Sequence, residues 1–104
     1  MIDTIKYMSV NYIVTEVEDL TMPEDANQDA YGTVDYGLGM IRLNSVQPPI
    51  IAWQTLFHEI VHIILRHSGN IDHDENEIER YAYGFLHLLK ENPDLQKLLL
   101  KETK

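Results

Sequence analysis

The sequence predicts an α+β fold, in which a small antiparallel sheet of about three strands is followed by two longer helices. Two patterns support this prediction. The first half alternates short β-branched and aromatic segments with glycines and acidic stretches, and the second half repeats apolar residues at helical spacing. The length of 104 residues fits one domain, residues 1–104, with a modest hydrophobic core.

Three segments of the first half have the composition of strands. Residues 10–17, VNYIVTEV, are rich in β-branched and aromatic side chains. Residues 32–36 and 40–44 are two shorter candidates, and the glycines between them favour a tight connection. Residues 18–31 are dense in Asp, Glu and Asn, so we expect a solvated loop there.

The first helix is expected over residues 50–67. Pro48 and Pro49 suit its lead-in and first turn, and Gly69 lies where a helix commonly ends. Further apolar residues fall outside its main stripe, so we expect this helix to be covered on more than one side. The main stripe consists of Ile50, Trp53, Phe57, Ile60, Val61 and Ile64.

A second helix is expected to begin near Asp72 or Asp74. Asp72 and Glu75 have the spacing of a capping box, and Pro93 ends the helix because the residue before a proline avoids helical angles. A last short helix follows, with Asn92 as its expected cap. The inward stripe of the second helix consists of Ile78, Ala82, Phe85, Leu86 and Leu89.

Composition limits the classes of partner and compartment. The formal net charge of −9 repels phosphate backbones, so we expect no direct binding to nucleic acid. No segment approaches the roughly 20 apolar residues of a membrane span, and the N-terminus lacks a basic region followed by an apolar run. The absence of cysteine excludes disulfides and thiolate metal sites. We therefore expect a cytoplasmic protein without a membrane partner.

The segment TLFHEIVHIILRH, residues 55–67, places three polar residues in an otherwise apolar helix. His58 and His62 are four residues apart, which sets them about 40° apart on one helical face, where one ion can bind both. Glu59 lies on the flank of that face, from which its carboxylate can reach a metal-bound water. The alternative is a pair of core histidines bonded to backbone carbonyls, with Glu59 at the surface. The pattern H-E-x-x-H favours a zinc site with Glu59 as the catalytic residue.

A catalytic zinc site needs a third protein ligand and an open position for water. On the expected second helix, Glu79 lies beside the inward stripe, one turn inside the helix. Glu75 also points inward, but a capping role competes with metal binding, so Glu79 is the predicted third ligand and Glu75 the alternative. Tyr83 is expected to be a half-buried core residue; the alternative is a group that orients the ligand or donates a proton to a developing oxyanion. Glu77 falls on the outer face of that helix, and His67 lies about 140° round from His62, so neither is favoured. His73 gives no positional signal.

The two segments TLFHEIVHIILRH and EIERYAYGFLHLL, with MIRLNSVQPP upstream, resemble the ImmA/IrrE family of zinc metallopeptidases. Members of this family occur on mobile elements such as phages and in bacterial stress regulators. The resemblance implies zinc bound by His58, His62 and Glu79, with Glu59 as general base. It also implies cleavage of a DNA-binding transcriptional repressor.

We therefore expect a zinc metalloendopeptidase that hydrolyses peptide bonds of a protein substrate. In this interpretation, residues 40–44 form the exposed strand edge on which an extended peptide pairs. The alternative function is a non-catalytic, metal-stabilised binding module that captures a basic protein partner. A fourth protein ligand, His67 or His73, would close the coordination sphere and favour the binding module.

Overall fold

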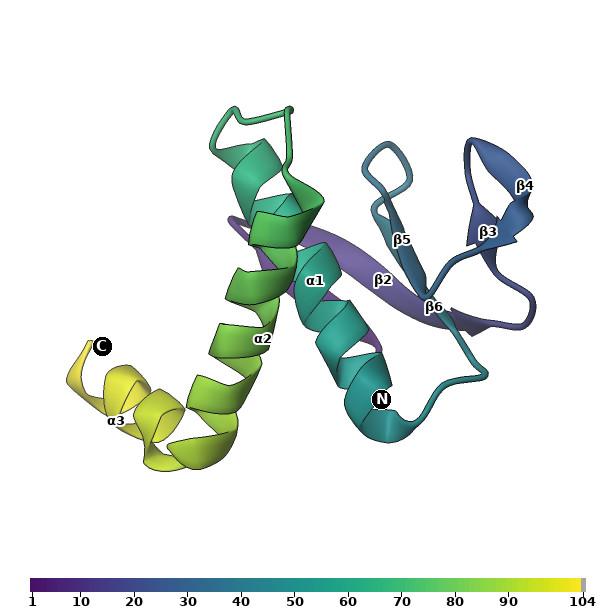
Figure 1. Cartoon of the computed structure of the whole chain (residues 1–104). Coiled ribbons are helices and arrows are strands. Elements are labelled where there is room, and N and C mark those ends of the chain that lie inside the picture. Colours follow the sequence, from purple (N-terminus) through teal and green to yellow (C-terminus); the bar gives the residue numbers. More distant parts are fainter. Residues whose placement is uncertain (104) are drawn as a thin grey trace.

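The computed structural model of the chain describes residues 1–103 and confirms the α+β fold (Figure 1). Six strands precede three helices along this part of the chain. The strands are β1 (Thr4–Tyr7), β2 (Val10–Val17), β3 (Thr21–Met22), β4 (Asp25–Asp29), β5 (Gly32–Asp35) and β6 (Met40–Asn44), and the helices are α1 (Pro49–His67), α2 (Glu75–Glu91) and α3 (Asp94–Glu102).

The main sheet has four strands in the order β1-β2-β6-β5. The β1/β2 and β5/β6 pairs are antiparallel, but β2 and β6 run parallel. The expectation of a purely antiparallel sheet of about three strands is therefore wrong in these details. The reason is the long connection between β2 and β6, which lets β6 enter the sheet alongside β2 in the same direction.

The strand edge next to the helices is β5, because β6 lies between β2 and β5. The expectation that residues 40–44 form an exposed edge is therefore wrong. Gly32 begins β5 close to α1: a Cβ at this position would lie 2.5 Å from Thr55 Cγ2. A larger residue would force the Thr55 side chain to shift, so the close approach of strand and helix favours glycine here.

Two strand pairs were not expected from composition. β1 pairs with β2 through a turn at Met8 and Ser9, which have φ values of 49° and 68°. β3 and β4 form a separate two-stranded hairpin inside the segment expected to be a loop. This hairpin stands at the end of the molecule opposite α2 (Figure 1).

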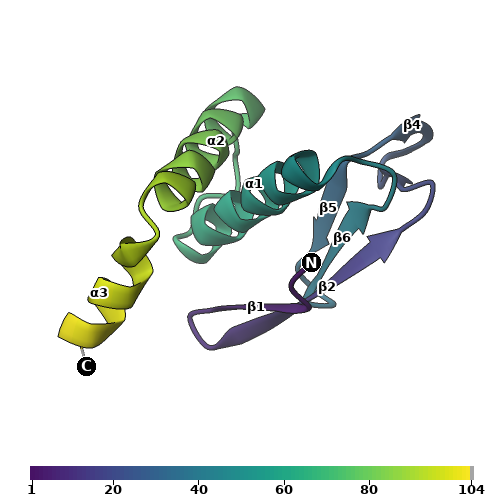
Figure 2. The same ribbon diagram turned by 90° about the horizontal axis from the view of Figure 1, so that it is seen from below.

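α1 lies between the sheet and α2, as Figures 1 and 2 both show. Leu56 and Ile63 face the sheet and are fully buried against Ile41 and Leu43 of β6. Val61 is buried against α2. Coverage on two sides is thus confirmed, but the buried face differs from the expected stripe, since Ile50, Trp53 and Ile64 are exposed.

α2 packs on α1 through Ile78, Ala82 and Leu86, whereas Phe85 and Leu89 of the expected stripe are exposed. Its cap is Asp74, whose side chain accepts hydrogen bonds from the backbone of Asn76 and Glu77, so a capping box on Asp72 is wrong.

α3 extends away from the body of the molecule (Figure 2), and none of its described residues is buried. Its cap position is Pro93 rather than Asn92, whose side chain instead donates to the carbonyl of Leu88. Within residues 1–103, no helix is both long enough and apolar enough to cross a membrane.

Candidate metal centre

A cleft of about 760 Å³ opens over the middle of α1. α1 forms its floor, the β3–β4 hairpin and the start of β5 line one side, and the first turns of α2 line the other. His58, Glu59 and His62 all contribute to the floor. The cleft thus brings the motif residues of α1 together with acidic residues of α2 that lie far away in sequence.

His58 and His62 lie one above the other on this face of α1. Their ring centroids are 5.0 Å apart, and both side chains are partly buried. One ligand atom from each of His58, Glu59 and His62 lies within 4.8 Å of the others. The predicted grouping of these three residues is therefore present in the fold.

Glu75, in the first turn of α2, contacts both motif histidines through its carboxylate. Its Oε2 lies 2.9 Å from His58 Nε2, and its Oε1 lies 3.2 Å from His62 Nε2. Because Asp74 caps α2, the Glu75 side chain is free to reach across to α1. Glu75 is the carboxylate that faces the same nitrogen of both histidines.

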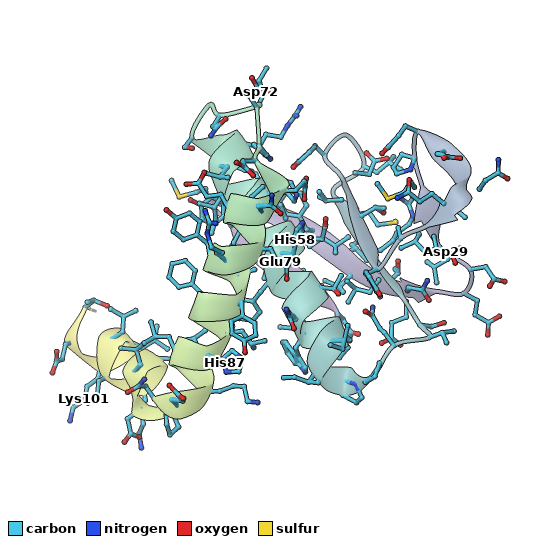
Figure 3. All side chains as sticks on the ribbon, viewed as in Figure 1. Asp29, His58, Asp72, Glu79, His87 and Lys101 are labelled. Atoms are coloured by element: carbon cyan, nitrogen blue, oxygen red, sulfur yellow. The ribbon has the colours of Figure 1, made fainter. Side chains whose placement is uncertain are left out.

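Glu79, the predicted third ligand, contacts the other nitrogen of His58. Its Oε2 lies 2.7 Å from His58 Nδ1, and its Oε1 accepts a hydrogen bond of 3.0 Å from Gln54 Nε2. Figure 3 shows Glu79 and His58 meeting between α2 and α1. The geometry places Glu79 at the Nδ1 of His58, whereas Glu75 lies at the Nε2 of the same ring.

The other two candidate histidines use their nitrogens elsewhere. His73 Nδ1 lies 2.6 Å from His62 Nδ1, and His73 Nε2 lies 2.5 Å from the carbonyl oxygen of Asn70. His67 Nε2 lies 2.9 Å from the hydroxyl of Tyr12, on the sheet side of α1. Neither residue directs a nitrogen at the point between His58 and His62.

Glu59 is the buried ionisable residue of the centre. It is 5% exposed, and its Oε2 has no hydrogen-bond partner within the described residues. Its pKa is raised to about 7 from the ordinary 4.5, chiefly by burial; the neighbouring His58 opposes this rise and the carboxylate of Glu75 adds to it. A carboxyl group held in this state can both accept and return a proton near neutral pH.

Burial also acts on the neighbours of Glu59. It lowers the pKa of His62, an effect that Glu75 opposes, so the neutral imidazole is favoured. It raises the pKa of the Tyr36 hydroxyl, and the negative charge of Glu59 adds to this rise. A neutral His62 is the form that binds a metal.

The residues present fit a divalent cation. A neutral imidazole carries one N–H, yet both nitrogens of His58 face carboxylate oxygens. One of those nitrogens therefore needs an extra proton or a cation. A cation shared by the two Nε2 atoms would satisfy this need, and two imidazoles with a carboxylate are a donor set typical of catalytic zinc.

Three features of the site were not apparent from the sequence. Gln54 donates a hydrogen bond to Glu79 and so fixes the position of that carboxylate. The only sign of this role in the sequence is that Gln54 lies one helical turn before His58. The contact of His73 with His62 depends on the path of the loop after α1. Tyr83 is 52% exposed, and its ring centroid lies 4.3 Å from that of His87, so the expectation that Tyr83 is a core residue is wrong.

The family model Peptidase_M78, described as the IrrE N-terminal-like domain, matches residues 16–100. The matched region contains all of α1 and α2, and therefore every residue of the candidate centre. No curated protein and no solved structure compared with the chain matches it.

Proposed function

The chain belongs to the Peptidase_M78 family, with its IrrE N-terminal-like domain, and on this premise we propose that it is a zinc-dependent metalloendopeptidase. Membership supports a metallopeptidase-type function and agrees with the resemblance inferred from the motif. The observation that carries the proposal is the buried, unpartnered carboxylate of Glu59 beside two histidines on one face of α1.

We propose that His58 and His62 hold the metal through their Nε2 atoms, with a carboxylate of α2 as the third ligand. Glu75 is favoured for this role because its two oxygens lie within 3.2 Å of both Nε2 atoms. Glu79 bonds to the Nδ1 of His58, a contact typical of groups that orient a metal-bound histidine. Direct binding of the metal by Glu79 stays a prediction, and the two glutamates can be compared experimentally.

The proposed chemistry is peptide hydrolysis with Glu59 as general base. Bound zinc would polarise the scissile carbonyl and lower the pKa of a water molecule. Glu59 accepts the proton of that water and returns it to the leaving amine. Its pKa of about 7 suits both steps, because the proton can be taken and released near neutral pH.

The cleft suits an extended, basic peptide. β5 is one of the two edge strands of the sheet, and its first residue lines the cleft, so a substrate strand can pair there. Among the described residues that line the cleft, five are acidic and none is Lys or Arg. The acidic residues are Glu24, Asp29, Glu59, Glu75 and Glu79.

A basic substrate is consistent with a DNA-binding transcriptional repressor, because proteins that bind phosphate backbones carry clustered Lys and Arg. We propose a protein of this chemical class as the substrate.

The arrangement of His67 and His73 favours an enzyme over a closed structural site. The Nε2 of His67 contacts the hydroxyl of Tyr12. The two nitrogens of His73 contact the Asn70 carbonyl and His62. No fourth protein ligand is therefore supplied by these two residues. An open position for water is what a catalytic zinc site requires.

The test compares wild-type protein with Glu59→Gln and with Glu77→Gln, which removes an exposed carboxylate from the first turn of α2. Zinc content is measured by elemental analysis, and cleavage of a Lys- and Arg-rich peptide library is measured by mass spectrometry. We expect all three proteins to hold zinc, with hydrolysis lowered about 10²–10⁴-fold only in Glu59→Gln. Full hydrolysis by Glu59→Gln would contradict the general-base role. Zinc binding without hydrolysis by the wild type would favour a binding module.

The third ligand is tested by zinc affinity of Glu75→Gln and Glu79→Gln. Loss of a group that only orients a ligand lowers metal affinity about 10–100-fold. We expect Glu79→Gln to fall within that range and Glu75→Gln to lose more. A larger loss in Glu79→Gln would instead assign the third ligand to Glu79.

A further inference from the structure

The loop after α1 brings His73 back to the motif helix, where its ring contacts that of His62. The two Nδ1 atoms are 2.6 Å apart, and the His73 ring lies 4.8 Å from the His62 ring between centroids. His73 Nε2 lies 2.5 Å from the Asn70 carbonyl oxygen. Both rings are partly buried, so this chain of contacts is partly shielded from water.

The direction of each hydrogen bond follows from the Asn70 carbonyl, which can only accept. His73 Nε2 must therefore carry the hydrogen and donate it to this oxygen. In a neutral His73, Nδ1 is then an acceptor. Because one of two facing nitrogens must donate, His62 donates its Nδ1–H to His73.

We propose that His73, fixed by the Asn70 carbonyl, is a positioning residue that holds His62 in the Nδ1–H tautomer. The Nε2 lone pair of His62 is then directed into the cleft, toward the position beside Glu75 Oε1. This inference rests on the proposed metal site for its functional meaning, because an unprotonated Nε2 is the form that binds a cation.

The two motif histidines are thus oriented by different chemical groups. His58 has the carboxylate of Glu79 at its Nδ1, whereas His62 has the neutral imidazole of His73. A carboxylate adds negative charge next to its histidine, and an imidazole acceptor adds none. His73 consequently fixes the orientation of His62 without adding a further negative charge to an already acidic cleft.

The test uses three variants of the full chain. His73→Phe keeps a flat ring but removes the acceptor, and His73→Asn restores an acceptor oxygen close to the position of Nδ1. His87→Phe is the matched control: His87 is also partly buried but lies on the far part of α2, away from His58 (Figure 3). Chemical-shift dispersion in amide spectra verifies that each variant is folded.

The first measurement is the ¹⁵N NMR signature of the His62 ring in metal-free protein at mildly alkaline pH, where imidazoles are neutral. We expect a protonated Nδ1 and an unprotonated Nε2 in wild type, His73→Asn and His87→Phe, and loss of this fixed tautomer in His73→Phe. A protonated Nε2 on His62 in the wild type would overturn the proposal.

The second measurement is zinc affinity by competition with a chromophoric chelator. We expect His73→Phe to bind zinc about 10–100-fold more weakly, with His73→Asn largely restored and His87→Phe unchanged. Unchanged affinity in His73→Phe would overturn the positioning role. A wild type without zinc affinity would overturn the proposed function instead, and the NMR measurement would still decide the tautomer.

Discussion

Glu59→Gln should stabilise the metal-free protein, and by an amount that depends on pH. The variant keeps the size of the side chain but removes the charge from a group that is 5% exposed and has an unpartnered oxygen in the described structure. The folded pKa of about 7 lies above the ordinary 4.5 because burial penalises the carboxylate. At about 1.4 kcal/mol for each tenfold change in ionisation, this difference corresponds to about 3 kcal/mol.

The sign follows from proton binding. Between pH 4.5 and 7 the folded state keeps the Glu59 proton that the unfolded state has released. The free energy of unfolding of the wild type therefore falls as pH rises through this window. The advantage of Glu59→Gln should be close to zero at about pH 4 and about 3 kcal/mol at about pH 8, a large share of the stability of a small domain.

The assay is urea denaturation in the presence of a chelator at several pH values between 4 and 8, followed by the fluorescence of Trp53, the single tryptophan. Glu16→Gln, which removes an exposed carboxylate from β2, is the control and should show no such trend. A difference between Glu59→Gln and wild type that stays constant across this pH range would refute the burial of a carboxylate at this position. Saturating zinc should reduce the trend, because a neighbouring cation favours the charged form.

Three further changes test the fold. Gly32→Ala should lower the free energy of unfolding by about 1–3 kcal/mol, because the added methyl meets Thr55 Cγ2, and adding Thr55→Ser should recover most of the loss. Ser9→Gly should raise it by about 1 kcal/mol, since Ser9 has a φ of 68°, and a decrease would contradict the turn geometry. Asp74→Ala should cost about 0.5–2 kcal/mol and reduce helicity in circular dichroism spectra, whereas Asp72→Ala should not.

The helical half of the fold was predictable because its signals are local. The bounds of α1 and α2 follow from prolines, a cap and apolar spacing, and the motif histidines share a face by helical geometry alone. The strands β2, β5 and β6 were also recognisable from their composition. β1 was missed because Met8 and Ser9 lack the Asn or Gly that marks a two-residue hairpin turn.

What depended on distant segments was not predictable. The parallel pairing of β2 with β6 and the position of β5 at the edge are set by the path of residues 18–31. In the site, the position of the cap decides whether the Glu75 side chain is free to face the histidines. With Asp74 rather than Asp72 as cap, Glu75 is released to face both histidines.

The shortness of β5 limits how a substrate can be recognised. At about 3.3 Å per residue, the four residues of β5 offer only about 13 Å of strand edge for main-chain hydrogen bonding. A bound peptide would form backbone hydrogen bonds with β5 over a few residues. Such bonds do not distinguish one side chain of the peptide from another. Under the proposed function, selection among substrates would then come from the side chains that line the cleft, which include Glu24 and Asp29 of the β3–β4 hairpin.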